Sequence, residues 1–216
     1  MTKPLSTKAR IVEQARRLFN EHGYGAITTA ALAAECGIAE GNLWYHFKTK
    51  RSLLDAVGEG FAQAVEQRLA MRPEGDPVAA YGRMLERMMD EFRAFRFVYR
   101  DQQAYGEHAE HIRGNVPRWL EQTFDQIEIY LAALVDADLL DWPRERLRDL
   151  AVNATIVLRY GLDHYRELGE PVGAGSGTVR RTLLRHLTLF EHRLDPRAGA
   201  QLHDAIERIG TEALAA

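Results

Sequence analysis

Apolar residues recur every three or four positions along nearly all of this chain of 216 residues, and that period predicts helices throughout. The strict alternation of apolar and polar residues that marks a half-buried strand is absent. Hydrophobic residues make up 46% of the chain, which is enough to build a sizeable core. We therefore predict an all-α fold in which proline and glycine mark the breaks between helices.

The breaks divide the chain into a series of amphipathic segments. The predicted helices cover residues 8–21, 28–36, 39–47, 50–71, 77–95, 117–139, 143–165, 178–194 and 197–214, with a shorter, less regular stretch from 96 to 115. We expect Pro77, Pro117 and Pro143 each to open a helix, because the first turn does not need the N–H that proline lacks. The glycine-rich segment from Gly169 to Gly177 is expected to be a flexible loop.

Charge is distributed unevenly along the chain. Residues 1–51 hold eight lysines and arginines against four acidic residues, whereas the remainder holds 20 basic against 27 acidic residues. A basic head on an acidic body favours a small nucleic-acid-binding domain, although chance variation on a mixed surface would look the same. We predict a head at residues 1–52, whose fourth helix continues to about residue 71 as a connector, and a larger domain at 53–216.

The segment from Thr28 to Phe47 has the pattern of a helix-turn-helix. The Thr28 hydroxyl can cap the backbone N–H groups of Ala30 or Ala31, and Gly37 permits a tight turn before the next helix. Small alanine side chains fill the first helix, as two closely crossing helices require. In the second helix, Leu43 and Phe47 are four positions apart and face the core.

The remaining residues of the second helix are left on or near its outer face. They are Glu40, Gly41, Asn42, Trp44, Tyr45 and His46. Against DNA, Asn42 can bind base edges, Gly41 admits the backbone, and Tyr45 and His46 can reach phosphates. Lys48 and Lys50 lie where the next helix begins, and both favour phosphate. The alternative is that Trp44 and Tyr45 are core aromatics, which would leave the helix apolar on nearly every side.

These residues resemble the TetR family of bacterial regulators. The run TTAALAAECGIAEGNLWYHFKTK is similar to the family pattern T-T-x-x-x-[IL]-A-x-x-x-G-[VI]-[ST]-x-x-x-[LI]-Y-x-H-F-x-[SN]-K. The resemblance implies phosphate contacts from Thr28, Tyr45, His46 and Lys50, and base contacts from the start of the second helix. The predicted DNA-binding residues are Thr28, Thr29, Glu40, Gly41, Asn42, Trp44, Tyr45, His46, Lys48 and Lys50.

Two positions depart from the family pattern. Ala39 stands where the family has a serine or threonine cap, which should weaken this helix by about 1 kcal/mol unless Glu40 offsets the loss through the helix dipole. Trp44 stands where tyrosine is commoner, so it is open whether this position makes the family's polar contact.

The resemblance also implies a ligand pocket and a dimer interface in the body. The residues predicted to line an apolar pocket are Met88, Phe92, Phe95, Tyr99, Trp119, Phe124, Tyr160 and His164. The residues predicted for the dimer interface are Leu158, Leu162, Leu183, Leu187 and Phe190. Ordinary core packing remains the alternative for each aromatic. Arg93, Arg96 and Arg100 could hold a ligand carboxylate or could simply be solvated.

The sequence offers little support for other classes of function. His108 and His111 are three apart, but no third metal ligand is evident, and we predict no metal and no cofactor. The single cysteine, Cys36, excludes an internal disulfide. No apolar run is long enough to span a membrane and no secretory signal is present, so we expect a cytoplasmic protein.

The predicted function is a homodimeric, sequence-specific DNA-binding regulator. We expect a repressor that a small hydrophobic or aromatic effector releases from a palindromic operator. An activator of the same fold is an open alternative. A helical enzyme acting on a small apolar substrate is a second alternative, but no nucleophile–base pair, carboxylate pair or phosphate loop supports catalysis.

Overall fold

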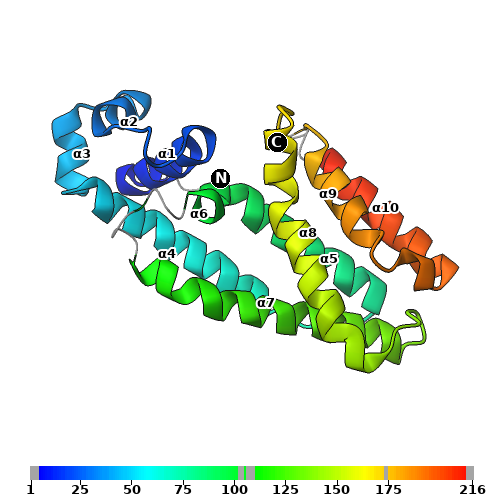
Figure 1. The fold of residues 1–216 in the computed structure, drawn as a ribbon. Helices are drawn as coiled ribbons and strands as arrows, with labels where there is room; N and C mark the ends of the chain where they lie inside the picture. The colour runs from blue at the N-terminus through cyan, green and yellow to red at the C-terminus, as the bar shows by residue number, and fades with distance from the viewer. Residues whose placement is uncertain (1–4, 102–104, 106–109, 173–174, 213–216) are drawn as a thin grey trace. The chain divides into compact units, whose positions relative to one another are not determined.

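The computed structural model describes residues 5–101, 105, 110–172 and 175–212. Within these ranges the regular structure is helical (Figure 1). The one strand-like feature of the described residues is an isolated antiparallel bridge between Leu140 and Leu194. The predicted all-α fold is therefore confirmed. None of the described helices is long and apolar enough to cross a membrane.

The chain forms two compact units. Unit 1 consists of Met1–Glu66 with Glu91–Pro117, and unit 2 consists of Gln67–Asp90 with Arg118–Ala216. Three helices pass from one unit to the other: α4 (Lys50–Leu69), α5 (Pro77–Ala94) and α7 (Glu110–Asp136). The sequence suggests a division after residue 52 between a nucleic-acid-binding head and a larger body. That division separates functions rather than compact units, and it stays a prediction.

Unit 1 contains the helices predicted for the head. They are α1 (Thr7–His22), α2 (Thr29–Glu35), α3 (Glu40–His46) and the first part of α4, joined by α6 (Arg96–Arg100). Their apolar faces form one core, whose buried members include Ile11, Phe19, Tyr24, Leu32, Leu43, Phe47, Leu54, Phe61 and Phe97. Three of these rings pack together, with the Phe19 centroid 5.2 Å from that of Tyr24 and 5.4 Å from that of Phe97.

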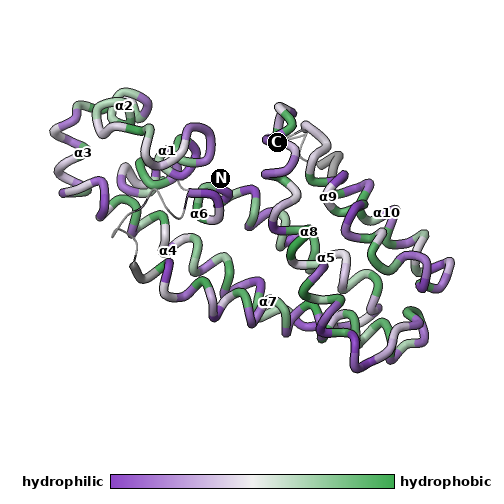
Figure 2. The backbone as a smooth tube through the Cα atoms, viewed as in Figure 1, coloured by the Kyte–Doolittle hydropathy of each residue, from purple (hydrophilic) through white to green (hydrophobic). Residues whose placement is uncertain are grey.

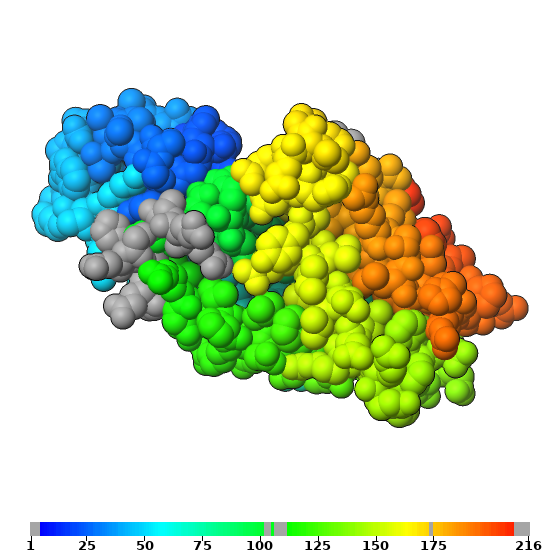
Figure 3. Space-filling view, in the orientation of Figure 1, coloured from blue at the N-terminus to red at the C-terminus, as the bar shows by residue number. Residues whose placement is uncertain are grey.

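Unit 2 contains the longer helices of the body. Besides its parts of α4, α5 and α7, it holds α8 (Leu147–Glu167), α9 (Thr178–Leu187) and α10 (Pro196–Glu212). Two 3₁₀ turns, Arg144–Arg146 and Glu191–Arg193, precede α8 and α10. The hydropathy-coloured tube shows apolar stretches recurring along α5, α8 and α9 (Figure 2). Helices α8 and α9 lie side by side on one face of the unit (Figure 3).

The three prolines that were predicted to open helices have three different positions in the structure. At Pro77 the prediction is confirmed, because α5 begins there and the Asp76 carboxylate accepts the Ala79 N–H at 2.7 Å. The prediction that Pro117 opens a helix is wrong, because α7 begins at Glu110 and contains Pro117 in its interior. Both Arg113 and Pro117 are exposed, so this turn of the helix, which lacks the proline N–H, is open to water. After Pro143 a 3₁₀ turn comes first, and α8 begins only at Leu147.

Close packing of α8 against α9 depends on Gly161. A Cβ atom at this position would lie 2.3 Å from Cγ2 of Thr182 and 2.7 Å from its Oγ1. Because real Cβ contacts are never that short, only glycine admits this approach of the two helices. The predicted continuation of α9 to residue 194 is also wrong, because α9 ends at Leu187 and a 3₁₀ turn follows.

Candidate nucleic-acid interface

The turn between α2 and α3 has the geometry that its sequence predicts. Thr28 is the N-cap of α2, and its hydroxyl oxygen accepts the Ala31 N–H at 3.1 Å. Gly37 adopts φ +65° after α2, and the Ile38 N–H returns to the Ala33 carbonyl at 3.0 Å. The second helix therefore leaves this turn at a fixed angle, as in a helix-turn-helix.

Helix α3 divides its side chains between the core and the solvent. Leu43 and Phe47 are buried, which confirms their predicted place in the core. Tyr45 is 76% exposed and Trp44 is 36% exposed, so both escape full burial and the alternative of two core aromatics does not hold. Glu40, Gly41 and Asn42 are also exposed, whereas His46 is half-buried with its ring 5.3 Å from that of Tyr45.

The start of α3 is held by a side-chain hydrogen bond from α2. Ala39 is the N-cap and makes no side-chain cap, as its sequence predicts. Next to it, the Thr29 hydroxyl donates to Oε1 of Glu40 at 2.8 Å. The Glu40 carboxylate lies in the first turn, where the helix dipole also favours negative charge. The pattern of residue types alone did not reveal this bond.

The start of α4 is capped reciprocally. The Ser52 N–H donates to the Thr49 hydroxyl oxygen at 3.0 Å, and the Thr49 N–H donates to the Ser52 hydroxyl oxygen at 3.2 Å. Thr49 thus caps the first turn of α4. Lys48, just before the cap, is exposed and available to a phosphate.

Lys50 has a different environment from Lys48. Its ammonium group donates to the backbone carbonyl of Tyr24 at 2.6 Å and lies 4.3 Å from the centre of the Tyr24 ring. Partial burial lowers the pKa of the Lys50 ammonium group. In this structure Lys50 thus binds its own chain, and its contact with phosphate stays a prediction.

The end of α1 is joined to α6 by a network that sequence reasoning missed. The Asn20 side chain accepts the Phe97 N–H at 3.0 Å and donates to the Ala94 carbonyl at 2.7 Å. Arg96 donates to the Asn20 carbonyl at 2.9 Å, and Arg100 donates to the Phe19 carbonyl at 3.0 Å. These two arginines cap the last carbonyls of α1 instead of standing free for a ligand carboxylate.

Two family models match successive parts of the chain. The model described as "Bacterial regulatory proteins, tetR family" matches residues 11–57, and the model described as "Bacterial transcriptional repressor" matches residues 60–202. The chain belongs to the TetR family. Members of this family are DNA-binding transcriptional regulators rather than enzymes.

Individual relatives each match part of this TetR-family protein. The uncharacterized HTH-type transcriptional regulator YerO of Bacillus subtilis is 36% identical over 73 residues, which are 31% of this chain and 25% of YerO. The tetracycline repressor protein class C of Escherichia coli is 31% identical over 91 residues, 42% of this chain and 40% of that protein. The chain thus matches between a quarter and two fifths of the length of these two curated relatives.

A solved structure matches the fold over nearly the whole chain. A TetR-family transcriptional regulator from Marinobacter aquaeolei VT8 superposes with a TM-score of 0.77, covering 95% of this chain and 99% of that chain. The two sequences are 22% identical, so this likeness concerns the fold.

The residues predicted for the ligand pocket fall into several environments. In unit 1, Phe92 and Phe95 are buried, and Tyr99 is half-buried with its hydroxyl donating to Glu91 at 2.7 Å. In unit 2, Met88 and Trp119 are buried, and Phe124 is half-buried. Tyr160 and His164 are exposed on α8. The pocket assignment stays a prediction. His108 lies outside the described residues, as does the side chain of His111.

The residues predicted for the dimer interface lie in the core of unit 2. All five are buried within one chain: Leu158, Leu162, Leu183, Leu187 and Phe190. Side chains already buried by their own chain gain no further burial from a partner. A dimer formed on α8 would therefore use its exposed residues, among which Ile156 is 50% and Tyr160 56% exposed.

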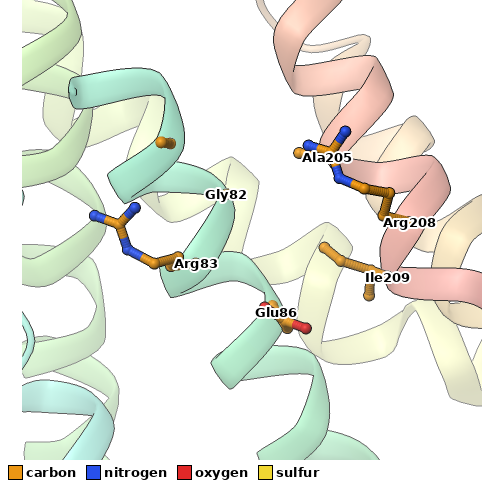
Figure 4. A pocket seen from close by; sticks show the side chains of 7 residues that line it. Gly82, Arg83, Glu86, Ala205, Arg208 and Ile209 are labelled. Carbon is orange, nitrogen blue, oxygen red and sulfur yellow. The ribbon is translucent and has the colours of Figure 1, made fainter. Parts of the chain in front are cut away.

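Unit 2 also contains a groove that the sequence did not predict. It has a volume of about 270 Å³ and lies between α5 and α10 (Figure 4). Its lining residues are Ala79, Gly82, Arg83, Glu86, Ala205, Arg208 and Ile209. None of the residues predicted for the ligand pocket is among them, and three charged side chains make this groove unlike an apolar pocket.

Proposed function

We propose that this TetR-family protein is a homodimeric repressor that binds a palindromic operator and is released by a small hydrophobic or aromatic effector. The observation that carries the DNA-binding part is the exposed face of α3, where Gly41, Asn42, Trp44 and Tyr45 face solvent while Leu43 faces the core. A helix that exposes aromatic and amide side chains over a buried leucine suits the major groove. We propose the cytoplasm as its place of action, because bacterial operators lie there.

The phosphate contacts are proposed for side chains that flank α3. Thr28 is exposed at the start of α2, and Lys48 is exposed before α4. Tyr45 and His46 extend from the second half of α3. Together they would hold the duplex from both sides of the recognition helix, while Glu40, Asn42 and Trp44 meet base edges. Thr29, at the first turn of α2, is proposed to belong to the same DNA-binding surface.

Binding to the protein's own upstream region tests the proposal. Fluorescence anisotropy with a labelled duplex should show tight binding by the wild type and loss of specific binding by Tyr45→Ala. Lys48→Ala should weaken binding about equally on specific and unrelated duplexes, since a phosphate contact carries no sequence information. Arg197→Ala is the matched control, because Arg197 is an exposed cation on α10 of unit 2. Equal affinities for all four proteins would contradict the assigned surface.

The dimer is proposed to form on the exposed stripe of α8. Val152, Ile156 and Tyr160 follow one another at four-residue spacing, so they lie along one side of the helix. Exposed isoleucine and tyrosine one turn apart favour a partner of the same kind, a second copy in a two-fold contact. Two heads held about 34 Å apart would read the half-sites of a palindrome on one side of the duplex.

Sedimentation velocity tests the dimer. The wild type should sediment as a dimer at micromolar concentration, and Ile156→Glu should sediment as a monomer with an unchanged helical circular-dichroism spectrum. Ile129→Glu is the control, because Ile129 is 46% exposed on α7 rather than α8. A dimer that survives Ile156→Glu and Tyr160→Asp would place the interface elsewhere.

The effector is proposed to bind among aromatic side chains. Within unit 1, the Phe92 and Tyr99 rings lie 5.2 Å apart, and the Phe61 ring lies 5.5 Å from Phe95. Such a cluster suits an apolar or aromatic molecule, with the Tyr99 hydroxyl as a polar contact. The relative that is named a tetracycline repressor supports both a small-molecule effector and repression.

Two measurements test the effector and the sign of regulation. A thermal-shift screen of hydrophobic acids, acyl thioesters and aromatic compounds should find one that raises the unfolding temperature and releases the duplex. A promoter–reporter fusion should then become more active when the gene is deleted. Lower reporter activity on deletion would make the protein an activator.

A further inference from the structure

Glu40 brings a negative charge to the surface that is proposed to face DNA. It is the first residue of α3, and its side chain is exposed. A carboxylate beside DNA repels the phosphates, so an acid at this position lowers affinity for DNA in general. Among the groups of DNA, only a base offers a hydrogen-bond donor that could offset this repulsion.

Thr29 fixes the position of that carboxylate. Its hydroxyl donates to Oε1 of Glu40 at 2.8 Å and joins the first turn of α2 to the first turn of α3. Because Thr28 rather than Thr29 is the N-cap of α2, the Thr29 hydroxyl is not required for capping and is free to make this bond. One carboxylate oxygen is therefore engaged within the protein, and Oε2 is left to accept from an outside donor.

The major groove offers few donors that Oε2 could accept from. Cytosine presents the N4 amino group, whereas guanine presents acceptors at N7 and O6. Adenine presents its N6 amino group beside the N7 acceptor, and a carboxylate has no hydrogen to give to N7. A single carboxylate oxygen thus matches cytosine better than any other base.

The neighbouring residue makes the approach possible. Gly41 is exposed, and a Cβ added there would meet nothing within 4 Å, so the surface next to Glu40 at the tip of the helix is open. Residues at the start of a recognition helix are those that enter the groove most deeply. We propose that Glu40, positioned by Thr29, reads one cytosine in each operator half-site and also lowers binding to other DNA.

This inference rests on the proposed DNA-binding role of α3, and a selection experiment separates the two. The full-length protein is used to select from a library of randomised duplex DNA, and the enriched sequences are compared between variants. The wild type should enrich a palindrome with cytosine at one fixed position in each half-site. Glu40→Gln should lose that cytosine in favour of adenine, because glutamine both donates and accepts, while the other positions keep their bases.

Thr29 is tested as a positioning residue by two matched substitutions. Thr29→Ser keeps the hydroxyl and should keep the cytosine, whereas Thr29→Val has the same shape without a hydroxyl and should relax the preference at this position alone. On a duplex carrying the selected site, replacing the cytosine should cost the wild type about tenfold in affinity and cost Glu40→Gln little. A general loss of folding would instead change every position of the selected sequence.

Non-specific binding supplies an independent readout. On an unrelated duplex at low salt, Glu40→Gln should bind several-fold more tightly than the wild type, because one repulsive charge is gone. Glu59→Gln removes the same charge from an exposed position more than two turns into α4, and it should leave binding unchanged. An unaltered selected sequence in Glu40→Gln, with selection abolished by Tyr45→Ala, would overturn the inference and leave the proposed function standing. No enriched sequence for the wild type would overturn both.

Discussion

The hydroxyl oxygen of Tyr81 on α5 lies 2.8 Å from Nε2 of His186 on α9, and both side chains are fully buried. The Phe190 ring lies 5.4 Å from the imidazole, and Nδ1 has no hydrogen-bond partner among the described residues. A charged imidazole here would be buried away from water. Burial therefore lowers the pKa of His186 to about 3.

The lowered pKa of His186 predicts that the folded protein loses stability in acid. In the unfolded chain histidine takes up a proton near pH 6.5, but in the folded protein His186 stays neutral until about pH 3. Its contribution to stability is complete above pH 6.5 and is lost as the pH falls from 6.5 towards 3, at up to about 1.4 kcal/mol per pH unit. Urea unfolding between pH 7 and 5 should show this slope in the wild type and in the exposed-histidine control His203→Gln, and a smaller slope in His186→Gln. Equal slopes in all three would show that His186 is not the group responsible.

Replacing Gly161 by alanine should change the free energy of unfolding in the direction opposite to the one that helix propensity favours. Alanine normally stabilises a helix by about 1 kcal/mol relative to glycine. At Gly161, however, the new methyl group would overlap the buried Thr182 side chain, and we expect Gly161→Ala to lower the free energy of unfolding by about 1 to 3 kcal/mol. Adding Thr182→Ala should recover part of the loss, because both clashing atoms are then removed.

Gly114 is the control for this prediction. It is exposed in α7, and an added Cβ would meet nothing within 4 Å. Gly114→Ala should therefore raise the free energy of unfolding by up to about 1 kcal/mol. If both glycine substitutions raised the urea midpoint, helix propensity and not the α8–α9 approach would be the deciding term.

The missing cap on α3 predicts a stabilising substitution. Ala39 has φ −66° and ψ 146°, the extended backbone that an N-cap requires, but it has no side-chain acceptor. Ala39→Ser should raise the free energy of unfolding by about 1 kcal/mol and slow amide exchange at Gly41 and Asn42. Ala34→Ser, at an exposed site within α2, should give no such gain. Unchanged exchange at the two amides would mean that the added hydroxyl does not cap.

Local patterns predicted the elements well where the deciding contacts were short in sequence. The caps at Thr28, Thr49 and Asp76 each bind a backbone N–H three residues ahead, so residue types and spacing were sufficient. The start of α7 was missed because the exposure of this helix around Pro117, which lets a proline stand inside it, is a tertiary property.

Contacts across the fold were beyond sequence reasoning. The network around Asn20 joins residues more than 70 positions apart, and nothing in the spacing of Asn20, Arg96 and Arg100 indicates it. For the same reason, the role of the apolar faces of α8 and α9 could not be predicted from the sequence. Their period showed that Leu158 and Leu183 face inward, but only the structure distinguishes a core within one chain from an interface between two.

The ammonium group of Lys50 stabilises the fold in this structure, so its removal should lower the stability of the protein. It donates to the Tyr24 carbonyl at 2.6 Å, and partial burial lowers its pKa. Lys50→Met removes the donor and leaves the half-buried carbonyl without this partner. We expect a loss of about 1 kcal/mol in the free energy of unfolding, measured by urea without DNA, whereas Lys48→Ala should have almost no effect there.

The salt dependence of DNA binding distinguishes the two lysines. For each phosphate contact that is lost, the slope of log K against log salt concentration decreases by about one. Lys48→Ala should show that decrease, and Lys50→Met should keep the wild-type slope while binding somewhat more weakly through the loosened start of α4. A slope reduced by one in Lys50→Met, with normal stability, would mean that Lys50 leaves Tyr24 when DNA arrives and becomes a phosphate contact itself.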